Sequence, residues 1–188
     1  MLVISIDPSI NPKNFGVCLF DTSIHQDPLR CLLPIESPDE YRKRLRVKFP
    51  PKDPMGYHRS KFIADWAYNI IWEWVQFEFS DLPVEDQHCV LLTEALVNKP
   101  SWASSPSAKA GRAKKMSLTQ RANDYVMAIC EIAGFEVVET NPSDYRSTKI
   151  ERSQKLDMIL GTDREPRNEH VDDAIHRGSL WITEQKFK

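Results

Sequence analysis

The chain has 188 residues, which is enough to bury a hydrophobic core within one domain. Its composition, with 41% hydrophobic and 28% charged residues, is typical of a soluble globular protein. The net charge is -2, and no apolar run approaches the roughly 18 residues that a transmembrane helix needs. These properties exclude a membrane-spanning protein and predict a single domain over residues 1–188.

The four cysteines lie singly in apolar segments, and no C-x-x-C pair occurs. This spacing argues against a zinc site and favours small buried thiols in a reducing compartment. The first residues enter a predicted strand directly, without the charged segment and cleavage site of a secretory signal. We therefore expect a cytoplasmic protein.

The first part of the chain predicts three β-strands, because short apolar runs are bounded by turn residues; they cover residues 2–7, 15–20 and 29–35. Residues 36–56 carry many prolines and charges and predict an irregular loop or insertion that could contain one short helical turn. Residues 60–79 predict a helix, since their apolar side chains repeat with a period near 3.6 residues.

Residues 90–93 predict a buried strand that ends at Glu94. Residues 98–116, rich in Ser, Pro, Ala and Lys, predict a mobile basic loop. The remaining predicted elements are a helix, a strand and two helices, over residues 117–133, 135–139, 153–160 and 169–181. Strands separated by helices imply an α/β fold, with a mixed five-stranded sheet flanked by helices.

Acidic residues end two of the predicted strands, Asp7 the first and Glu94 the fourth. A carboxylate at the end of a buried strand is costly without a partner, and a cation is the simplest partner. On the last helix, His170 and Asp173 lie three residues apart and share a face. Such ligands suit Mg²⁺ or Mn²⁺, and two ions can drive phosphoryl transfer. The pattern predicts a metal-dependent nuclease.

Neighbouring residues on the last helix have alternative explanations. Glu169 lies four residues before Asp173 and could also reach the site, whereas Asp172 lies about 100° further round the helix. Favourable charge at a helix N-terminus is the preferred explanation of both acids. For His170, the alternative to a metal ligand is a capping or solvent-exposed histidine.

Three motifs, taken in order and context, resemble those of RuvC-type Holliday junction resolvases of the RNase H-like superfamily: Ile4-Ser-Ile-Asp7-Pro8-Ser9, Leu91-Leu-Thr-Glu94 and His170-Val-Asp-Asp173-Ala174-Ile175. The basic segment from Asn141 to Lys149 also looks like part of this family, and the resemblance covers most of the chain. Residues 36–56 exceed what a minimal member needs, and the G-x-G pattern that some members carry near Lys149 is absent. This divergence favours a phage-type resolvase acting in the cytoplasm of a bacterial host.

The resemblance implies hydrolysis of a DNA phosphodiester with two divalent metal ions, Mg²⁺ or Mn²⁺, in each active site. Asp7 would bridge both ions, Glu94 would bind one, and His170 with Asp173 would hold the other. Lys149 would stabilise the transition-state phosphate, unless it is a plain surface lysine. The family also implies a homodimer with two-fold symmetry that nicks two strands symmetrically. The helix over residues 117–133 is a candidate interface, or it could be sandwiched within one subunit.

Basic residues gather in three patches, which is typical of a protein that binds a polyanion; the alternative is a set of solvated loops. One patch, over residues 42–52, holds Arg42, Lys43, Arg44, Arg46, Lys48 and Lys52. The candidate DNA-binding residues come from the other two patches: Lys99, Lys109, Arg112, Lys114, Lys115, Arg146, Arg152 and Lys155. Trp102, in the predicted mobile loop, could wedge into or stack on the DNA, or fold back onto the protein.

The sequence supports more than one function. The first is a structure-selective endonuclease that resolves four-way junctions, and other branched DNA, in recombination and repair. The second is an RNase H-like nuclease for RNA–DNA hybrids or structured RNA. The third is a non-catalytic junction-binding module, against which the complete set of acids argues. An actin-like ATPase would need glycine-rich phosphate loops, and the chain has six glycines.

Overall fold

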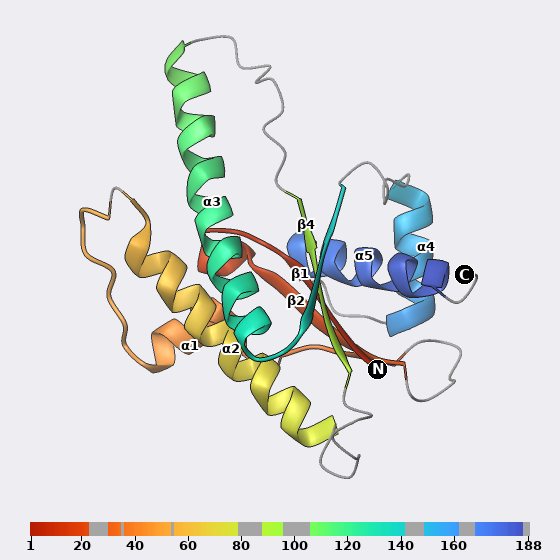
Figure 1. Ribbon diagram of the computed structural model, residues 1–188. Coiled ribbons are helices and arrows are strands. Elements are labelled where there is room, and N and C mark those ends of the chain that lie inside the picture. The colour runs from red at the N-terminus through yellow and green to blue at the C-terminus, as the bar shows by residue number, and fades with distance from the viewer. Residues whose placement is uncertain are drawn as a thin grey trace.

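A mixed β-sheet forms the centre of the molecule (Figure 1). The computed structural model describes residues 1–22, 30–34, 36–53, 55–78, 88–95, 106–141, 149–161 and 168–185. The five strands are β1 (Leu2–Asp7), β2 (Gly16–Asp21), β3 (Arg30–Leu32), β4 (Cys89–Glu94) and β5 (Glu136–Thr140), in the order β3-β2-β1-β4-β5. β1 to β3 are antiparallel, whereas β1, β4 and β5 run parallel. This arrangement confirms the predicted mixed five-stranded sheet.

Helices cover both faces of the sheet (Figure 1). The helical segments are η1 (Pro12–Asn14), α1 (Pro38–Arg44), α2 (Tyr57–Glu78), α3 (Pro106–Ile132), α4 (Lys149–Leu160) and α5 (Glu169–Gln185). α2 and α3 pack against one face, and α5 with α4 covers the other. Among the described residues, no helix is both long enough and apolar enough to cross a membrane.

Alternation along β1 determines which face each side chain joins. Leu2, Ile4 and Ile6 belong to the core under α2 and α3. Val3 belongs to the second core, which contains residues of α5 such as Ala174 and Ile175. The alternation carries Asp7 to the α5 side of the sheet.

The same alternation applies to β4. Cys89 and Leu91 belong to the core under α2 and α3, whereas Val90 and Leu92 belong to the core under α5. Glu94 therefore also falls on the α5 side. Asp7 and Glu94 therefore lie on the same face of the sheet. Asp7 follows Val3, and Glu94 follows Leu92, by an even number of residues, and both Val3 and Leu92 belong to the core under α5.

The prediction for residues 36–56, an irregular segment that could contain one short helical turn, underestimates its order, because residues 38–44 form the seven-residue helix α1. Ser37 and Glu40 form a capping box, in which the Ser37 side chain accepts from the Glu40 backbone N–H and Glu40 accepts from the Ser37 backbone N–H. Pro38 occupies the first turn, where a missing N–H costs nothing. The proline that suggested a loop is thus part of a helix start.

The prediction of a mobile loop over residues 98–116 is wrong from Pro106 onward, where α3 begins. Residues 98–105 lie outside the described residues. The segment 106–116 is rich in Ala and Lys, which have high helix propensity, but it has no apolar stripe to reveal a helix. In Figure 1 this green end of α3 extends well beyond the sheet, so propensity and continuity with the packed part of the helix explain its conformation.

Candidate active site

Asp7 and Glu94 end neighbouring parallel strands. The register pairs Ser5 with Leu92, and extending it by two residues brings Asp7 opposite Glu94. Both residues are shielded from solvent, with Asp7 8% exposed and the Glu94 side chain 25% exposed. The strand pairing, rather than any local motif, brings these two carboxylates together.

The N-terminal part of α5 lies over these strand ends. The His170 imidazole Nδ1 hydrogen-bonds Asp7 Oδ2. Gly16, at the start of β2, permits this approach, since a Cβ atom at that position would overlap the backbone carbonyl of His170. The sequence prediction that His170 and Asp7 converge agrees with this contact.

His170 is biased toward its protonated form. The hydrogen bond to the Asp7 carboxylate raises the pKa of His170, and partial burial opposes that rise. The contact with Asp7 therefore favours the protonated imidazole. Coordination of a metal ion by His170 would require its neutral form.

Asp173 faces the same region from the next turn of α5, and it forms an ion pair with Arg152 of α4. Burial is the largest influence on Asp173 and raises its pKa; the charge of Arg152 opposes this effect, and the nearby charge of Asp7 reinforces it. Arg152 was predicted as a DNA-binding residue, but in this structure its guanidinium is held by a site carboxylate.

Arg177 is a member of this site that the sequence prediction missed. Its Nη2 donates to Glu94 Oε2 at 2.5 Å and to Asp7 Oδ1 at 3.3 Å, and its Nη1 donates to the Ile6 carbonyl at 2.6 Å. A signal was available, because Arg177 follows Asp173 by four residues and His170 by seven, on one face of α5. An arginine on the buried side of a helix needs an acidic partner.

The donor set suits a hard divalent cation, since carboxylate oxygens and one imidazole are ligands of Mg²⁺ and Mn²⁺. Among the described residues, however, no three His, Cys, Asp or Glu side chains stand in an arrangement ready to hold a metal ion. Arg177, His170 and Arg152 contact the carboxylates instead. The chemistry of Asp7, Glu94 and Asp173 fits a metal ion. In this structure their carboxylates contact arginine and histidine side chains.

The predicted DNA-binding residues have different outcomes. Lys99, Trp102 and Arg146 lie outside the described residues. Lys109 and Arg112 fall within α3 and Lys149 begins α4, but their side chains are not described. Lys114 and Lys115 are exposed on the extended end of α3, and Lys155 on α4 is partly buried.

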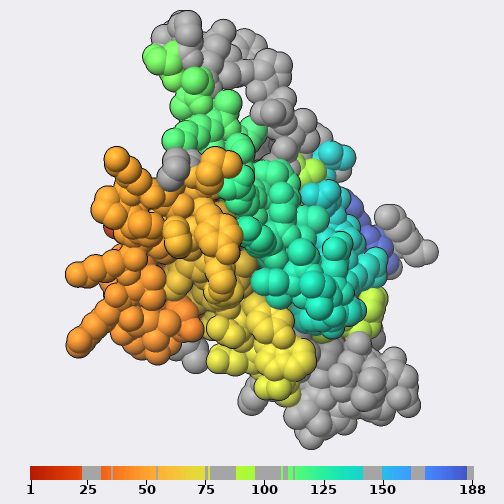
Figure 2. All heavy atoms as spheres, turned by 60° about the vertical axis from the view of Figure 1, so that its left-hand side comes forward, coloured from red at the N-terminus to blue at the C-terminus, as the bar shows by residue number. Residues whose placement is uncertain are grey.

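A pocket of about 340 Å³ lies beside η1, close in sequence to Asp7. Its lining includes three basic residues, Lys13, Arg42 and Arg59. The guanidinium groups of Arg42 and Arg59 lie 5.9 and 5.7 Å from the centre of the Phe49 ring. Figure 2 shows long side chains projecting from the orange segment that contains α1. Residues 10–13 and 39–59 both contribute to this pocket, and the acid Asp39, which pairs with Arg42, also lines it.

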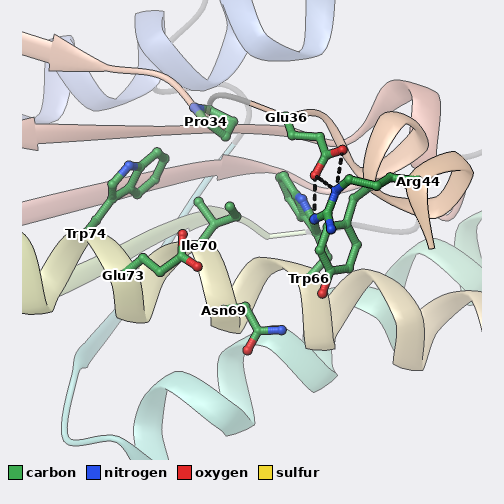
Figure 3. A pocket seen from close by; sticks show the side chains of 9 residues that line it. Pro34, Glu36, Arg44, Trp66, Asn69, Ile70, Glu73 and Trp74 are labelled. Carbon is green, nitrogen blue, oxygen red and sulfur yellow. Dashed lines mark hydrogen bonds and ion pairs between the residues drawn. The ribbon is translucent and has the colours of Figure 1, made fainter.

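A second pocket, of about 640 Å³, lies between α1 and α2 (Figure 3). Trp66, Trp74 and Ile70 form apolar walls, and the Glu36–Arg44 ion pair, at 2.9 Å, closes one side. None of the four predicted metal ligands lines it. This pocket is therefore separate from the carboxylate site.

Comparison with known proteins supports the fold. No family model matches the sequence, and no curated protein matches it. RuvC of Thermus thermophilus is 19% identical, with a TM-score of 0.59 over 100% of this chain and 96% of that chain. The same RuvC in complex with a Holliday junction substrate is 17% identical, with a TM-score of 0.59 over 100% and 96%.

A third solved structure, the yeast mitochondrial Holliday junction resolvase Ydc2, is 15% identical, with a TM-score of 0.53 over 98% of this chain and 78% of that chain. The α/β fold of this chain is that of RuvC and Ydc2. The resemblance to RuvC-type resolvases, first inferred from three short motifs, is thus confirmed at the level of the fold.

Proposed function

We propose that this protein is a structure-selective DNA endonuclease that resolves four-way junctions and other branched DNA. The main support is that Asp7 and Glu94, at the ends of parallel strands, lie together and that His170 of α5 contacts Asp7. The chain that brings them together has the fold of RuvC and Ydc2. The Thermus protein was solved in complex with a Holliday junction substrate, which supports junction DNA as the substrate class.

In this proposal, Asp7, Glu94, His170 and Asp173 hold two divalent ions, Mg²⁺ or Mn²⁺. When bound, such ions supply activation of the attacking water and stabilisation of the leaving oxygen. The chain itself orients the ligands: the sheet register positions both strand-end acids, and α5 adds His170 and Asp173. Lys149, at the start of α4, is proposed to stabilise charge on the reacting phosphate.

The DNA backbone is proposed to contact the basic surfaces on either side of the acids. Lys114 and Lys115 are exposed on α3, and Lys13, Arg42 and Arg59 line the pocket beside η1. Contacts of this kind position DNA without reading its sequence. Lys99, Trp102, Lys109, Arg112, Arg146 and Lys155 complete the proposed DNA-binding set.

A homodimer is proposed, because symmetric nicking of two strands requires two active sites related by a two-fold axis. α3 offers a candidate surface, since Ile132 at its end is 87% exposed although it is a large apolar residue. Sedimentation of the purified protein, alone and with junction DNA, measures this state directly.

The test is cleavage of a synthetic mobile four-way junction with Mg²⁺ or Mn²⁺ by the wild type and by Asp7→Asn. We expect paired symmetric nicks from the wild type, and a loss of about a hundredfold or more in Asp7→Asn with junction binding retained. Asp65→Asn is the matched control, because Asp65 is an exposed acid on α2 paired with Lys61.

Each other outcome favours a different function. Binding of the junction with no cleavage by the wild type would support a non-catalytic junction-binding module. Preferential cleavage of an RNA–DNA hybrid would support an RNase H-like nuclease. Equal cleavage by the wild type and Asp7→Asn would remove Asp7 from the catalytic site.

A further inference from the structure

Arg177 is the cation that the two strand-end carboxylates share. One of its nitrogens donates to Glu94 at 2.5 Å and to Asp7 at 3.3 Å, and the other donates to the Ile6 carbonyl at 2.6 Å. The Arg177 side chain is only 7% exposed. This guanidinium is therefore a fixed, buried part of the site rather than a surface group that touches it by chance.

The packing of α5 accounts for this position. Gly178, the next residue, lies so close to β1 and β2 that an added Cβ would overlap the Phe20 ring and would lie 3.0 Å from the Ser5 Cβ. The helix axis is consequently near the sheet, and Arg177 reaches along the strand ends. Three separate segments, the ends of β1 and β4 and the middle of α5, must all be folded for these contacts to form.

The contacts have an electrostatic consequence. Two carboxylates at a shielded site repel each other, and a buried guanidinium that bonds both offsets this repulsion. A divalent ion bound by the same carboxylates would lie beside the Arg177 charge in a region of reduced dielectric screening. Metal binding and the Arg177 contacts therefore oppose each other.

We propose that Arg177 competes with the metal for Asp7 and Glu94: it stabilises the metal-free site, and its bond to Glu94 is released when a divalent ion binds. This inference rests on the proposed function only in requiring that these acids bind a divalent ion. Arg177 is then a positioning residue that lowers the affinity of the site for metal.

The test compares Mn²⁺ affinity and stability in the wild type and in Arg177→Met, which keeps an unbranched apolar stem and removes the charge. Electron paramagnetic resonance of free Mn²⁺ measures the affinity, and thermal unfolding in EDTA and in Mn²⁺ measures the stability. We expect Arg177→Met to bind Mn²⁺ at least about tenfold more tightly, equivalent to about 1.4 kcal/mol. We also expect it to melt earlier in EDTA and to regain stability in Mn²⁺.

The matched control is Arg44→Met, which breaks an Arg–Glu pair of 2.9 Å beside the α1–α2 pocket. It should leave Mn²⁺ affinity unchanged. A folded Arg177→Met that binds Mn²⁺ no more tightly than the wild type overturns the proposal and leaves Arg177 a structural residue. The same conclusion follows if neither protein binds Mn²⁺.

A second variant covers the case in which Arg177→Met does not fold. Arg177→Lys keeps the charge, but a single ammonium cannot reproduce the planar fork that serves Ile6 and Glu94 together. We expect it to fold and, because it loses part of the contacts with Glu94 and Ile6, to bind Mn²⁺ more tightly than the wild type; equal or weaker binding overturns the proposal. Junction cleavage is measured separately, so tighter Mn²⁺ binding without any cleavage would reject the proposed function and retain this inference.

Discussion

Polar contacts behind Glu94 join the end of β4 to its neighbours. The Thr93 hydroxyl donates to Asn123 Oδ1 of α3 at 2.8 Å, and both residues are fully buried. The Thr140 hydroxyl of β5 donates to the Thr93 carbonyl at 3.0 Å. Since Thr93 directly precedes Glu94, these bonds hold the strand end that carries the acid.

Thr93→Val should destabilise the protein by about 1–3 kcal/mol, because it deprives a buried amide oxygen of its donor while preserving side-chain shape. Urea denaturation measures the change. The double variant Thr93→Val/Asn123→Leu should recover part of the lost stability, since it also removes the Asn123 amide that Thr93→Val leaves without its donor.

Thr183→Val is the matched control for this change. The Thr183 hydroxyl donates to the Ser179 carbonyl within α5 at 2.8 Å. Removing this hydroxyl leaves no buried side-chain amide without a hydrogen-bond donor. We expect an effect within about 0.5 kcal/mol. Equal losses in the two single variants would show that the Thr93–Asn123 bond has no special role.

At the scale of elements, α5 is positioned by two close approaches to the sheet, at Gly16 and at Gly178. Gly16 faces the backbone carbonyl of His170, and backbone cannot give way as a flexible side chain can. The short distance between β2 and α5 is what allows His170 to reach Asp7. A packing constraint in β2 therefore controls the geometry of the site.

Gly16→Ala should lower the free energy of unfolding by more than about 2 kcal/mol, because the added methyl group must displace the start of α5. Gly111→Ala is the control, since no atom lies within 4 Å of the added Cβ. In a helix, that change should stabilise the protein by about 0.5–1 kcal/mol. Chemical denaturation distinguishes the two, and similar values would contradict the close packing of α5.

α1 contributes an ion-paired acid whose effect depends on pH. Bonds from Arg42 and then Lys43 lower the pKa of Asp39 below its usual value of 3.8. Because the folded-state pKa is depressed, Asp39 contributes stability above pH 3.8 that is lost as the pH falls through the lowered value.

Asp39→Asn should therefore destabilise the protein at pH 7 by about 1 kcal/mol, and the difference from the wild type should shrink below pH 3.8. Urea denaturation at a series of pH values measures this. Asp124→Asn, at an exposed acid whose described partner is the neutral Gln120, is the control. A difference that stays constant into acid would contradict the ion-pair explanation.

At the scale of the whole molecule, a net charge of -2 coexists with basic residues on α1 and on the extended end of α3. These basic residues and the carboxylate site come from different parts of the chain, and the sheet brings them into one body (Figure 1). Under the proposed function, a DNA backbone would contact these local charges, so the net charge of the chain would matter less.

The double variant Lys114→Gln/Lys115→Gln should weaken junction binding and reduce the slope of log K against log salt by about 1–2, as each lost phosphate contact releases fewer counterions. Fluorescence anisotropy over a salt series measures the slope. Lys61→Gln, at an exposed lysine paired with Asp65, should leave it unchanged. An unchanged slope in the double variant would place the DNA elsewhere.

The sequence by itself determined the main elements and indicated four candidate site residues. Apolar runs and turn residues located the strands within one or two residues of β1, β2, β4 and β5. The signal is strong in β1, β2 and β4, which are buried on both faces. Asp7 and Glu94 were recognisable as acids at strand ends, and His170 with Asp173 as one helix face. The start of α3 was missed, because an exposed helix end carries no apolar period.

Only the tertiary structure decided how these residues meet. The contacts of Arg177 with Ile6 and Glu94, and of His170 with Asp7, join parts of the chain that lie far apart in sequence. They depend on the parallel register of β1 with β4 and on the close approach of α5 at Gly16 and Gly178. No local pattern encodes such contacts, because their energy comes from groups that become neighbours only when the sheet and its helices are packed.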